Sequence, residues 1–431
     1  MKQLHSSLEN RGLWWINPVG CLTCFLVPIA TVCLILPPAA YKTYWRSEKL
    51  YDAGSFGLCI LAFASIIFGA LAGQVIAGGR PSGPAHVAFT VASDNRFIKK
   101  ALAVAIFFSM LGHLVWLAIM IHNGLRFGNL LAMLSGTQGA SFTIRGYSEF
   151  IPGITTLMHL HVVVWMLASL LDWKYVSLSL RTGVLCVVAF TVFRALFNSE
   201  RLALLEAAIP AGLLWVRFRG LLRRPALWLK LAPVILYAGL YVLFCLTEYN
   251  RYWVNSASST REGFFSFAGF HLLGYYATAL NNGALFMSLN MHSSAPTTVF
   301  NFIYNMPYVG NIIAALSGIT YDIGDDLSLN KIGMVNRDFT NISGIFPVYM
   351  DLGIPLAVGL WVALGVVMGF CYQRYKSGSL RESLIFAYGF VGLLELPRIF
   401  YWSSTRAFYS WVFIFIVILM LSPRWGGVRH D

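Results

Sequence analysis

Charged residues are scarce in this sequence. Asp, Glu, Lys and Arg supply only 11% of its 431 residues, whereas hydrophobic residues supply 58%. A single aqueous core cannot bury so much apolar surface, so the composition excludes an ordinary soluble protein and predicts an integral membrane protein. The sequence also lacks a repeat of fixed period and a low-complexity linker. One membrane domain over residues 1–431 is therefore the simplest organisation.

The hydrophobic residues are gathered in runs of about 20, long enough to cross a hydrocarbon core of roughly 30 Å. Only helices and closed barrels satisfy their backbone in lipid, and these runs are too long and too little alternating for barrel strands of about 10 residues. The sequence predicts an all-α, polytopic transmembrane helix bundle of about 10 (10–12) spans. They are expected near residues 14–38, 54–78, 99–121, 151–171, 182–197, 202–216, 231–247, 346–370, 384–397 and 407–422.

Acidic residues are fewer than basic ones, 18 against 31, which gives a net charge of +13. Such an excess is found in nucleic-acid-binding proteins as well as in membrane proteins, so its distribution decides between the two classes. With a cytoplasmic N-terminus, 18 basic and 5 acidic residues fall inside, and 13 of each fall outside. The positive-inside rule explains the whole excess, and we predict no nucleic-acid partner.

Cysteines number seven and lie within or beside apolar runs, so they do not indicate an extracellular disulfide framework. Cys21 and Cys24 have the spacing of half a redox or zinc motif, but no second half follows. We interpret the cysteines as packing residues. The basic start and first apolar run are interpreted as a retained signal-anchor, because many spans follow.

The longest polar-enriched region, residues 248–345, is predicted to be a large loop on the outer face. Within it, Phe264 to Leu289 is apolar enough to enter the membrane, but no cytoplasmic basic cluster follows it. We expect a re-entrant or interface-lying helix pair there, with a full extra pair of spans as the alternative. Long loops in compact proteins are usually functional, so this one is a candidate functional region.

A short outer turn between the fifth and sixth spans carries Arg194, Glu200 and Arg201. Asn198 or Ser199 is expected to cap the next helix, whose N-terminus would then form an anion site with the two arginines. Interfacial anchoring of the arginines is the plainer alternative. Glu206 lies in an apolar helix, where an ionisable group usually faces a partner or cavity; a structural ion pair and a catalytic carboxylate both fit it.

Aromatic, amide and carboxylate residues are concentrated in two further stretches, residues 248–253 and 275–282. Sugar recognition uses this combination, because apolar sugar faces stack on rings while hydroxyls need both donors and acceptors. Aromatic belts at a membrane interface have the same composition.

Four stretches together resemble the Wzy-type oligosaccharide repeat-unit polymerases of the bacterial inner membrane. They are Ile151-Pro-Gly-Ile-Thr-Thr-Leu157; Asn198-Ser-Glu-Arg-Leu-Ala-Leu-Leu-Glu206; Glu248-Tyr-Asn-Arg-Tyr-Trp253 with Tyr275-Tyr-Ala-Thr-Ala-Leu-Asn-Asn282; and Asn341 to Gly353. The resemblance implies a GT-C-like fold and an enzyme that polymerises O-antigen or a related surface polysaccharide on the periplasmic side. Its donor and acceptor would be oligosaccharides linked to undecaprenyl pyrophosphate, with membrane lipid around them and a chain-length-regulating co-polymerase as partner.

Such a reaction needs a cationic site for the leaving pyrophosphate and a base for the acceptor hydroxyl. We hypothesise that Arg194, Arg201 and Arg251 bind pyrophosphate, that Arg398 and Arg406 complete a basic rim, and that Tyr276, Asn281 and Asn341 contact sugar. The carboxylates Glu200, Glu206 and Glu248, together with Arg201, form the candidate catalytic set; each carboxylate is either the base or an arginine orienter.

No cofactor and no metal are expected. His159 and His161 stand two apart on a predicted helix, so their rings are expected to point in different directions. His271 and His292 are isolated in the sequence. Asp322, Asp325 and Asp326 lack the spacing and closing glutamate of a Ca²⁺ loop and are interpreted as a solvated turn.

Two other functions remain open. An O-antigen ligase would use the same donor but transfer the finished polymer to lipid A core. A non-enzymatic flippase or exporter of lipid-linked sugar would be expected to show inverted repeats and polar residues at mid-bilayer. The polar residues here gather toward the outer face instead, which favours surface chemistry.

Overall fold

The computed structural model describes residues 13–78, 96–198, 200–222, 225–254, 263–289, 297–306, 308–317, 335–336 and 339–421. Every regular element in these ranges is helical, which confirms the all-α prediction. The helices that build the bundle are α2 (Pro18–Cys21), η1 (Leu22–Leu26), α3 (Val27–Ile35), α5 (Ala53–Gly78), α7 (Arg96–His122), η2 (Thr155–Leu160), α10 (His161–Leu170), α11 (Leu178–Phe197), α12 (Arg201–Phe218), α14 (Ala232–Glu248), α16 (Phe264–Ser288), α20 (Phe346–Ser377), α21 (Leu380–Glu395) and α22 (Thr405–Leu421).

Five helical segments in the described ranges are long and apolar enough to cross a membrane. Three shorter apolar helices accompany them: Thr155–Leu170, Ala232–Glu248 and Thr405–Leu421. By length and composition these helices are consistent with a membrane protein, and each of the ten expected spans is mostly helical, whereas the number that cross the membrane stays a prediction. The five long segments are Pro18–Ile35, Ala53–Gly78, Arg96–His122, Leu178–Phe197 and Phe346–Ser377.

Short helices occupy several segments that were expected to be loops. They are α4 (Pro38–Trp45), α8 (Phe127–Leu134), α9 (Ala140–Gly146), η3 (Trp173–Tyr175), α13 (Leu227–Lys230), η4 (Tyr249–Trp253), α17 (Asn301–Tyr304), α18 (Val309–Ser317) and η6 (Tyr401–Ser403). The expectation of a helix pair near Phe264 is wrong, because α16 runs unbroken for 25 residues. Asp322, Asp325, Asp326 and His292 lie outside the described residues.

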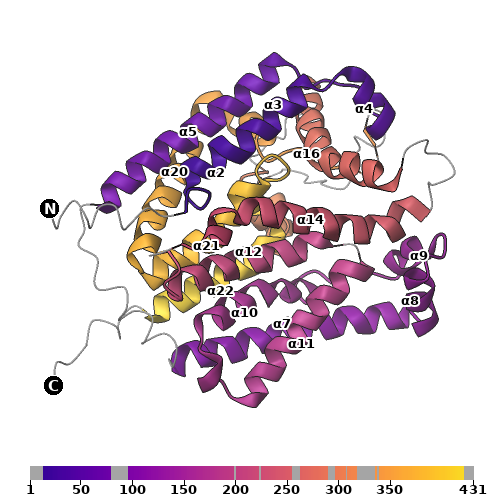
Figure 1. Ribbon diagram of the computed structural model, residues 1–431, viewed down its shortest axis with the longest axis vertical. Helices are drawn as coiled ribbons and strands as arrows, with labels where there is room; N and C mark the ends of the chain where they lie inside the picture. The colour runs from indigo at the N-terminus through magenta and orange to yellow at the C-terminus, as the bar shows by residue number, and fades with distance from the viewer. Residues whose placement is uncertain are drawn as a thin grey trace.

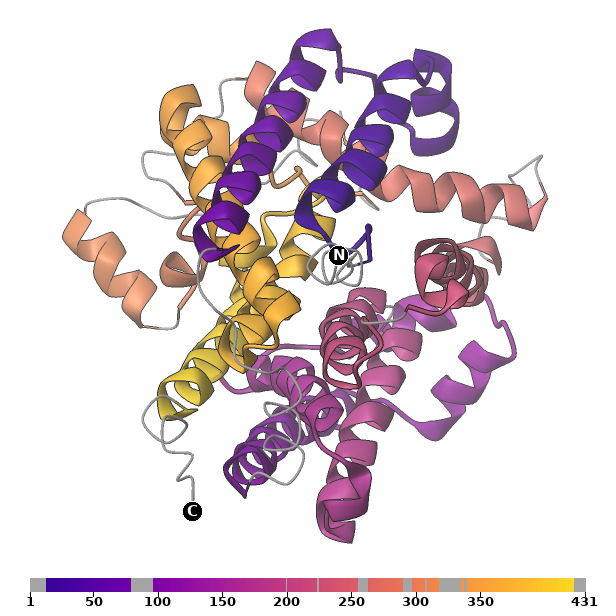
Figure 2. The ribbon, with the colours of Figure 1, turned by 60° about the vertical axis from the view of Figure 1, so that its left-hand side comes forward.

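The helices form two groups with a layer between them. In Figures 1 and 2, α2, α3, α5 and α20 lie on one side, whereas α7, α10 and α11 lie on the other. The helices α12, α21 and α22 lie between these groups, and α12 packs against both α10 and α21. A set of charged residues lies at the predicted outer ends of five helices, α11, α12, α14, α21 and α22.

Helices α5 and α20 make the most extensive helix pair of the described bundle. Gly69 and Gly73 of α5 face Gly365 and Gly369 of α20, so the two backbones touch. A β-carbon added to Gly69 would lie 2.1 Å from the carbonyl oxygen of Val362. Small residues spaced by four allow this approach, and dispersion over the close contact then holds the pair together in lipid.

Helix α20 is interrupted near its start. Gly353 has φ of 69° and ψ of 164°, a backbone conformation that favours glycine, and Pro355 follows within the next helical turn. A short helical segment before Gly353 therefore precedes the long apolar stretch. All seven cysteines are free.

Candidate active site

Two linked clusters of buried charges form the candidate site. The Glu206 network comprises Arg194, Glu200, Glu206 and Arg406, with His159, His161 and Tyr401 around it. The Glu248 network comprises Arg201, Glu248, His271, Tyr275, Glu395 and Arg398. Helix α12 connects the two, because Arg201 is its first residue and Glu206 lies in its second turn.

The turn from α11 to α12 positions Glu200 between two arginines. Its carboxylate accepts a short hydrogen bond from Arg194 and lies 3.3 Å from Nη2 of Arg406. The side-chain amide of Asn198 donates to the same carboxylate at 2.8 Å. Asn198 therefore orients Glu200 rather than capping α12, whose N-cap residue is Glu200 with no side-chain capping bond. The capping expectation is wrong for Asn198, and Ser199 lies outside the described residues.

Glu200 is ionised throughout the physiological range. Burial alone would raise its pKa, but the positive charges of Arg194 and Arg406 outweigh that effect and lower the pKa to about 2. A carboxylate of such low basicity is poorly suited to remove a proton from a sugar hydroxyl. Glu200 thus fits the role of arginine orienter.

Glu206 is held by several donors at once. Nε of Arg406 lies 3.1 and 3.0 Å from its two oxygens, and the Tyr401 hydroxyl donates to Oε2 at 3.0 Å. Burial, followed by the Glu206 charge, raises the pKa of Tyr401 well above its ordinary range, so the hydroxyl stays protonated and remains a donor. Glu206 is fully buried, whereas the Arg406 side chain is 25% exposed, so the ion pair is desolvated on its glutamate side.

The two histidines converge on Glu206, and the expectation that their rings diverge is wrong. Nδ1 of His159 and Nε2 of His161 lie 3.7 and 3.8 Å from Oε1 of Glu206. The reason is local: the chain is 3₁₀-helical up to Leu160 and α-helical from His161, so the usual angular spacing does not apply.

The donor atoms of His159, His161 and Glu206 all lie within 4.8 Å of one another, an arrangement that could hold a metal ion. A cation there would compete with Arg406 for Glu206. Bound through Nε2 of His161, it would also displace the contact of that nitrogen with the carbonyl oxygen of Ala203, at 2.8 Å, whereas Nδ1 would keep its contact with the carbonyl oxygen of Met158 at 2.9 Å.

The Glu248 network is built around an arginine on an aromatic wall. Arg201 forms a short ion pair with Glu248 and donates to the Tyr275 hydroxyl at 2.9 Å. Its guanidinium carbon lies 4.0 Å from the ring centre of Phe244, within cation–π range. Glu248 is the last residue of α14 and is followed directly by the π-helical turn η4; such turns often occur at functional sites.

His271 adds an ionisable ring to this network. Its Nε2 lies 3.4 Å from Oε2 of Glu248, and the ring is packed against Phe267 and Phe339. Arg398 also lies beside Tyr275, 5.6 Å from its ring centre, and pairs with Glu395 at 3.2 Å. Glu395 is within electrostatic reach of Glu206 and Arg406, which joins the two networks.

Three arginines of these two networks have buried N–H groups without a hydrogen-bond partner among the described residues. They are Nε and Nη1 of Arg194, Nη1 of Arg201, and Nε of Arg398. Buried donors are almost always paired in folded proteins, because leaving one unpaired costs about 1–3 kcal/mol. Unpaired arginine donors are therefore suited to an anionic ligand.

Most of the candidate residues predicted from the sequence are brought together. Arg194, Glu200, Arg201, Glu206, Glu248, Arg398 and Arg406 all belong to the two networks. Tyr276 lies within electrostatic reach of Glu395 and Arg398. Arg251 lies in η4, but its side chain is outside the described part of the structure.

The side-chain amide of Asn281 has structural contacts instead. Oδ1 of Asn281 accepts from the backbone N–H groups of Leu50 and Tyr51 at 2.6 and 3.0 Å, and its Nδ2 donates to the carbonyl of Glu48 at 2.7 Å. This engagement makes Asn281 a support of the fold rather than a sugar contact. Asn341 is half-buried, and its backbone carbonyl accepts from Asn282.

Sequence reasoning missed Glu395, His271 and the role of Tyr275. Glu395 had a usable signal, since it interrupts the apolar run Val391-Gly-Leu-Leu-Glu-Leu396, where an ionisable residue is costly. His271 had none, because only tertiary packing brings it beside Glu248.

No family model, curated protein or solved structure matches this chain.

Proposed function

We propose that this chain is a membrane-embedded glycosyltransferase that joins oligosaccharide repeat units carried on undecaprenyl pyrophosphate. The product would be O-antigen or a related surface polysaccharide, made at the periplasmic face of the bacterial inner membrane. The observation that supports this most directly is the set of buried arginine donors without partners in the described structure, on Arg194, Arg201 and Arg398. Pyrophosphate offers the several strong acceptors that such a set requires.

The proposed reaction is a substitution at an anomeric carbon. The acceptor hydroxyl oxygen attacks that carbon, the bond from the carbon to the pyrophosphate oxygen breaks, and undecaprenyl pyrophosphate leaves with the electron pair. Arg194, Arg201 and Arg398 stabilise the charge that develops on the leaving group, because fixed donors in a low-dielectric site act strongly. Arg406 belongs to the same rim, and Tyr276 and Asn341 remain the candidate sugar contacts.

We assign Glu248 as the base that removes the proton from the acceptor hydroxyl. Both oxygens of Glu200 and of Glu206 are engaged by Arg, Asn or Tyr donors, so these two carboxylates position the arginines. Glu248 shares Arg201 with the incoming pyrophosphate. When Arg201 turns toward the leaving group, its pull on Glu248 weakens and the carboxylate becomes a better base. His271, 3.4 Å away, is placed to take the proton onward.

The ligase alternative differs only in the acceptor, so the same residues would serve it. The flippase alternative is less well supported by the charge distribution. The ion pairs join the ends of α11, α12, α14, α21 and α22 on the predicted outer side, whereas transport sites usually lie near the bilayer midplane.

The test is a series of variants assayed with undecaprenyl-pyrophosphate-linked repeat units. We expect wild type to produce a ladder of longer lipid-linked products, Glu248→Gln to lower its rate by about 10²–10⁴-fold as removal of a general base does, and Arg194→Ala to weaken donor binding and rate together. Arg145→Ala, on α9, is the control and should leave the ladder intact. Equal ladders from Glu248→Gln and wild type would contradict the assignment of the base. Transfer to lipid A core without a ladder would indicate the ligase.

A further inference from the structure

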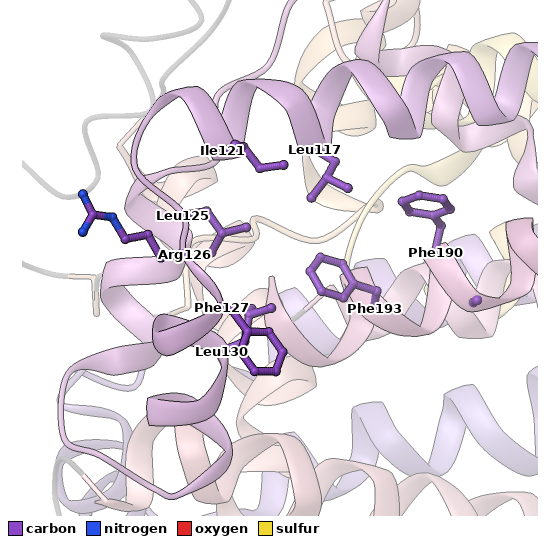
Figure 3. A pocket seen from close by; sticks show the side chains of 9 residues that line it. Leu117, Ile121, Leu125, Arg126, Phe127, Leu130, Phe190 and Phe193 are labelled. Carbon is purple, nitrogen blue, oxygen red and sulfur yellow. The ribbon is translucent and has the colours of Figure 1, made fainter.

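An apolar cavity of about 540 Å³ opens between α7, α8 and α11. In Figure 3, Leu117 and Ile121 of α7, Leu130 of α8, and Phe190 and Phe193 of α11 point into it. Arg126 is the one charged residue of its lining, and its side chain points outward from the edge. Its volume falls in the range of about 300–1,000 Å³ that is typical of small-molecule sites.

The cavity adjoins the Glu206 network through α11. Residues four apart lie on the same helix face, so Arg194 follows Phe190 one turn nearer the predicted outer end. The Phe190 ring also lies 5.3 Å from the ring of His113, in the buried core. Arg194 is fully buried, and its Nε and Nη1 have no hydrogen-bond partner in the described structure. An apolar cavity and an unsatisfied cationic group thus share one helical stripe.

We propose that this cavity holds the isoprene units of the lipid carrier nearest to its phosphate, while Arg194 binds that phosphate. The inference rests on the proposed function, and it adds the place where the lipid chain enters the protein. A polyprenyl phosphate carries its charge directly at the end of one hydrocarbon chain. Its binding site therefore needs an apolar cavity directly beside a cation.

The mouth of the cavity is suited to a chain that continues into lipid. Ile121 is 57% exposed and Phe127 is 73% exposed, and both line the opening. Ile121 lies at the predicted outer end of α7, a helix long enough to cross the membrane, and α8 follows just beyond it, so the mouth is expected to lie at the outer edge of the hydrocarbon layer. The remaining isoprene units would then lie in the bilayer without further contact with the protein.

Ala189 provides the test, because it lines the cavity yet is exposed, so a larger side chain can fill the space without displacing the core. Binding of undecaprenyl phosphate to the purified full-length chain would be measured for wild type, Ala189→Trp and Arg194→Ala. Val75→Trp, at an exposed position of α5, is the matched control. We expect Ala189→Trp to weaken undecaprenyl phosphate binding about tenfold, because a few buried methylenes suffice for that change.

Two further probes are inorganic pyrophosphate, which tests the anion site, and phosphatidylglycerol, which tests whether the occupant is an ordinary bilayer lipid. Inorganic pyrophosphate reports the anion site alone: we expect Ala189→Trp to leave its binding unchanged and Arg194→Ala to weaken it. If Arg194→Ala leaves pyrophosphate binding unchanged, the proposed anion site is overturned but the lipid cavity is not.

The cavity proposal is overturned if Ala189→Trp binds undecaprenyl phosphate as Val75→Trp does. It is also overturned if phosphatidylglycerol binds wild type as tightly as undecaprenyl phosphate does and Ala189→Trp weakens the binding of both lipids equally. The occupant would then be an ordinary bilayer lipid.

Discussion

Replacing Glu206 by Gln should destabilise the protein, because it leaves a buried position without the charge that pairs with the partly buried Arg406. Arg406 contacts both oxygens of Glu206 at 3.1 and 3.0 Å, and Glu206 is less than 1% exposed. Breaking a buried pair from one side typically costs about 3–5 kcal/mol. Arg406 is 25% exposed and would still pair with Glu200, 3.3 Å away, so we expect a loss of no more than about 3 kcal/mol.

The chain contains its own control for this measurement. Lys42 and Glu48 form an ion pair at 3.0 Å with both side chains about 60% exposed, where screening by water leaves about 0–1 kcal/mol. The free energy of unfolding would be measured in mixed micelles of increasing denaturing detergent for wild type, Glu206→Gln and Glu48→Gln. A Glu206→Gln variant no less stable than Glu48→Gln would refute the reasoning that burial of Glu206 makes its ion pair with Arg406 important for stability.

Two other predictions follow from the packing and from the charges. Gly69→Leu should separate α5 from α20 and lower the unfolding midpoint, because its β-carbon would lie 2.1 Å from the Val362 carbonyl, whereas Gly57→Leu, where a β-carbon meets no atom within 4 Å, should be tolerated. Glu200 has a pKa lowered from 4.5 to about 2, so the unfolded chain binds more protons there and the stability Glu200 contributes is lost as pH falls from about 4.5 toward 2. Thermal unfolding measured across this pH window should show a smaller fall in the unfolding midpoint for Glu200→Gln than for wild type. Midpoints that fall in parallel for the two proteins would contradict the assigned ion pairs.

The positions of the long helices could be predicted because lipid forces a spanning backbone to satisfy itself within a helix. The short helices α8 and α9 could not, since seven or eight residues leave no long apolar run to detect. Residues close in sequence, such as Arg194 and Glu200, were predicted together and do pair.

Pairs that depend on tertiary packing were not predictable. Arg406 reaches Glu206 across 200 residues of sequence, and no pattern in the chain specifies that meeting. The convergence of His159 and His161 depends on a change from 3₁₀ to α geometry at Leu160 that the sequence does not signal. Asn281 was predicted to contact sugar from its polar, aromatic-rich surroundings, yet backbone groups of Glu48, Leu50 and Tyr51 take up its amide.

The most direct test of the central claim is to follow the lipid product. Purified protein would be reconstituted with undecaprenyl-pyrophosphate-linked repeat units in EDTA, and free undecaprenyl pyrophosphate would be quantified against the new glycosidic linkages. The account predicts one undecaprenyl pyrophosphate released for each linkage, with no requirement for a divalent cation, and loss of both products in Arg194→Ala. Substrate that changes leaflet without release of undecaprenyl pyrophosphate would contradict it and indicate a transporter, and activity abolished by EDTA would direct attention to His159, His161 and Glu206 as metal ligands.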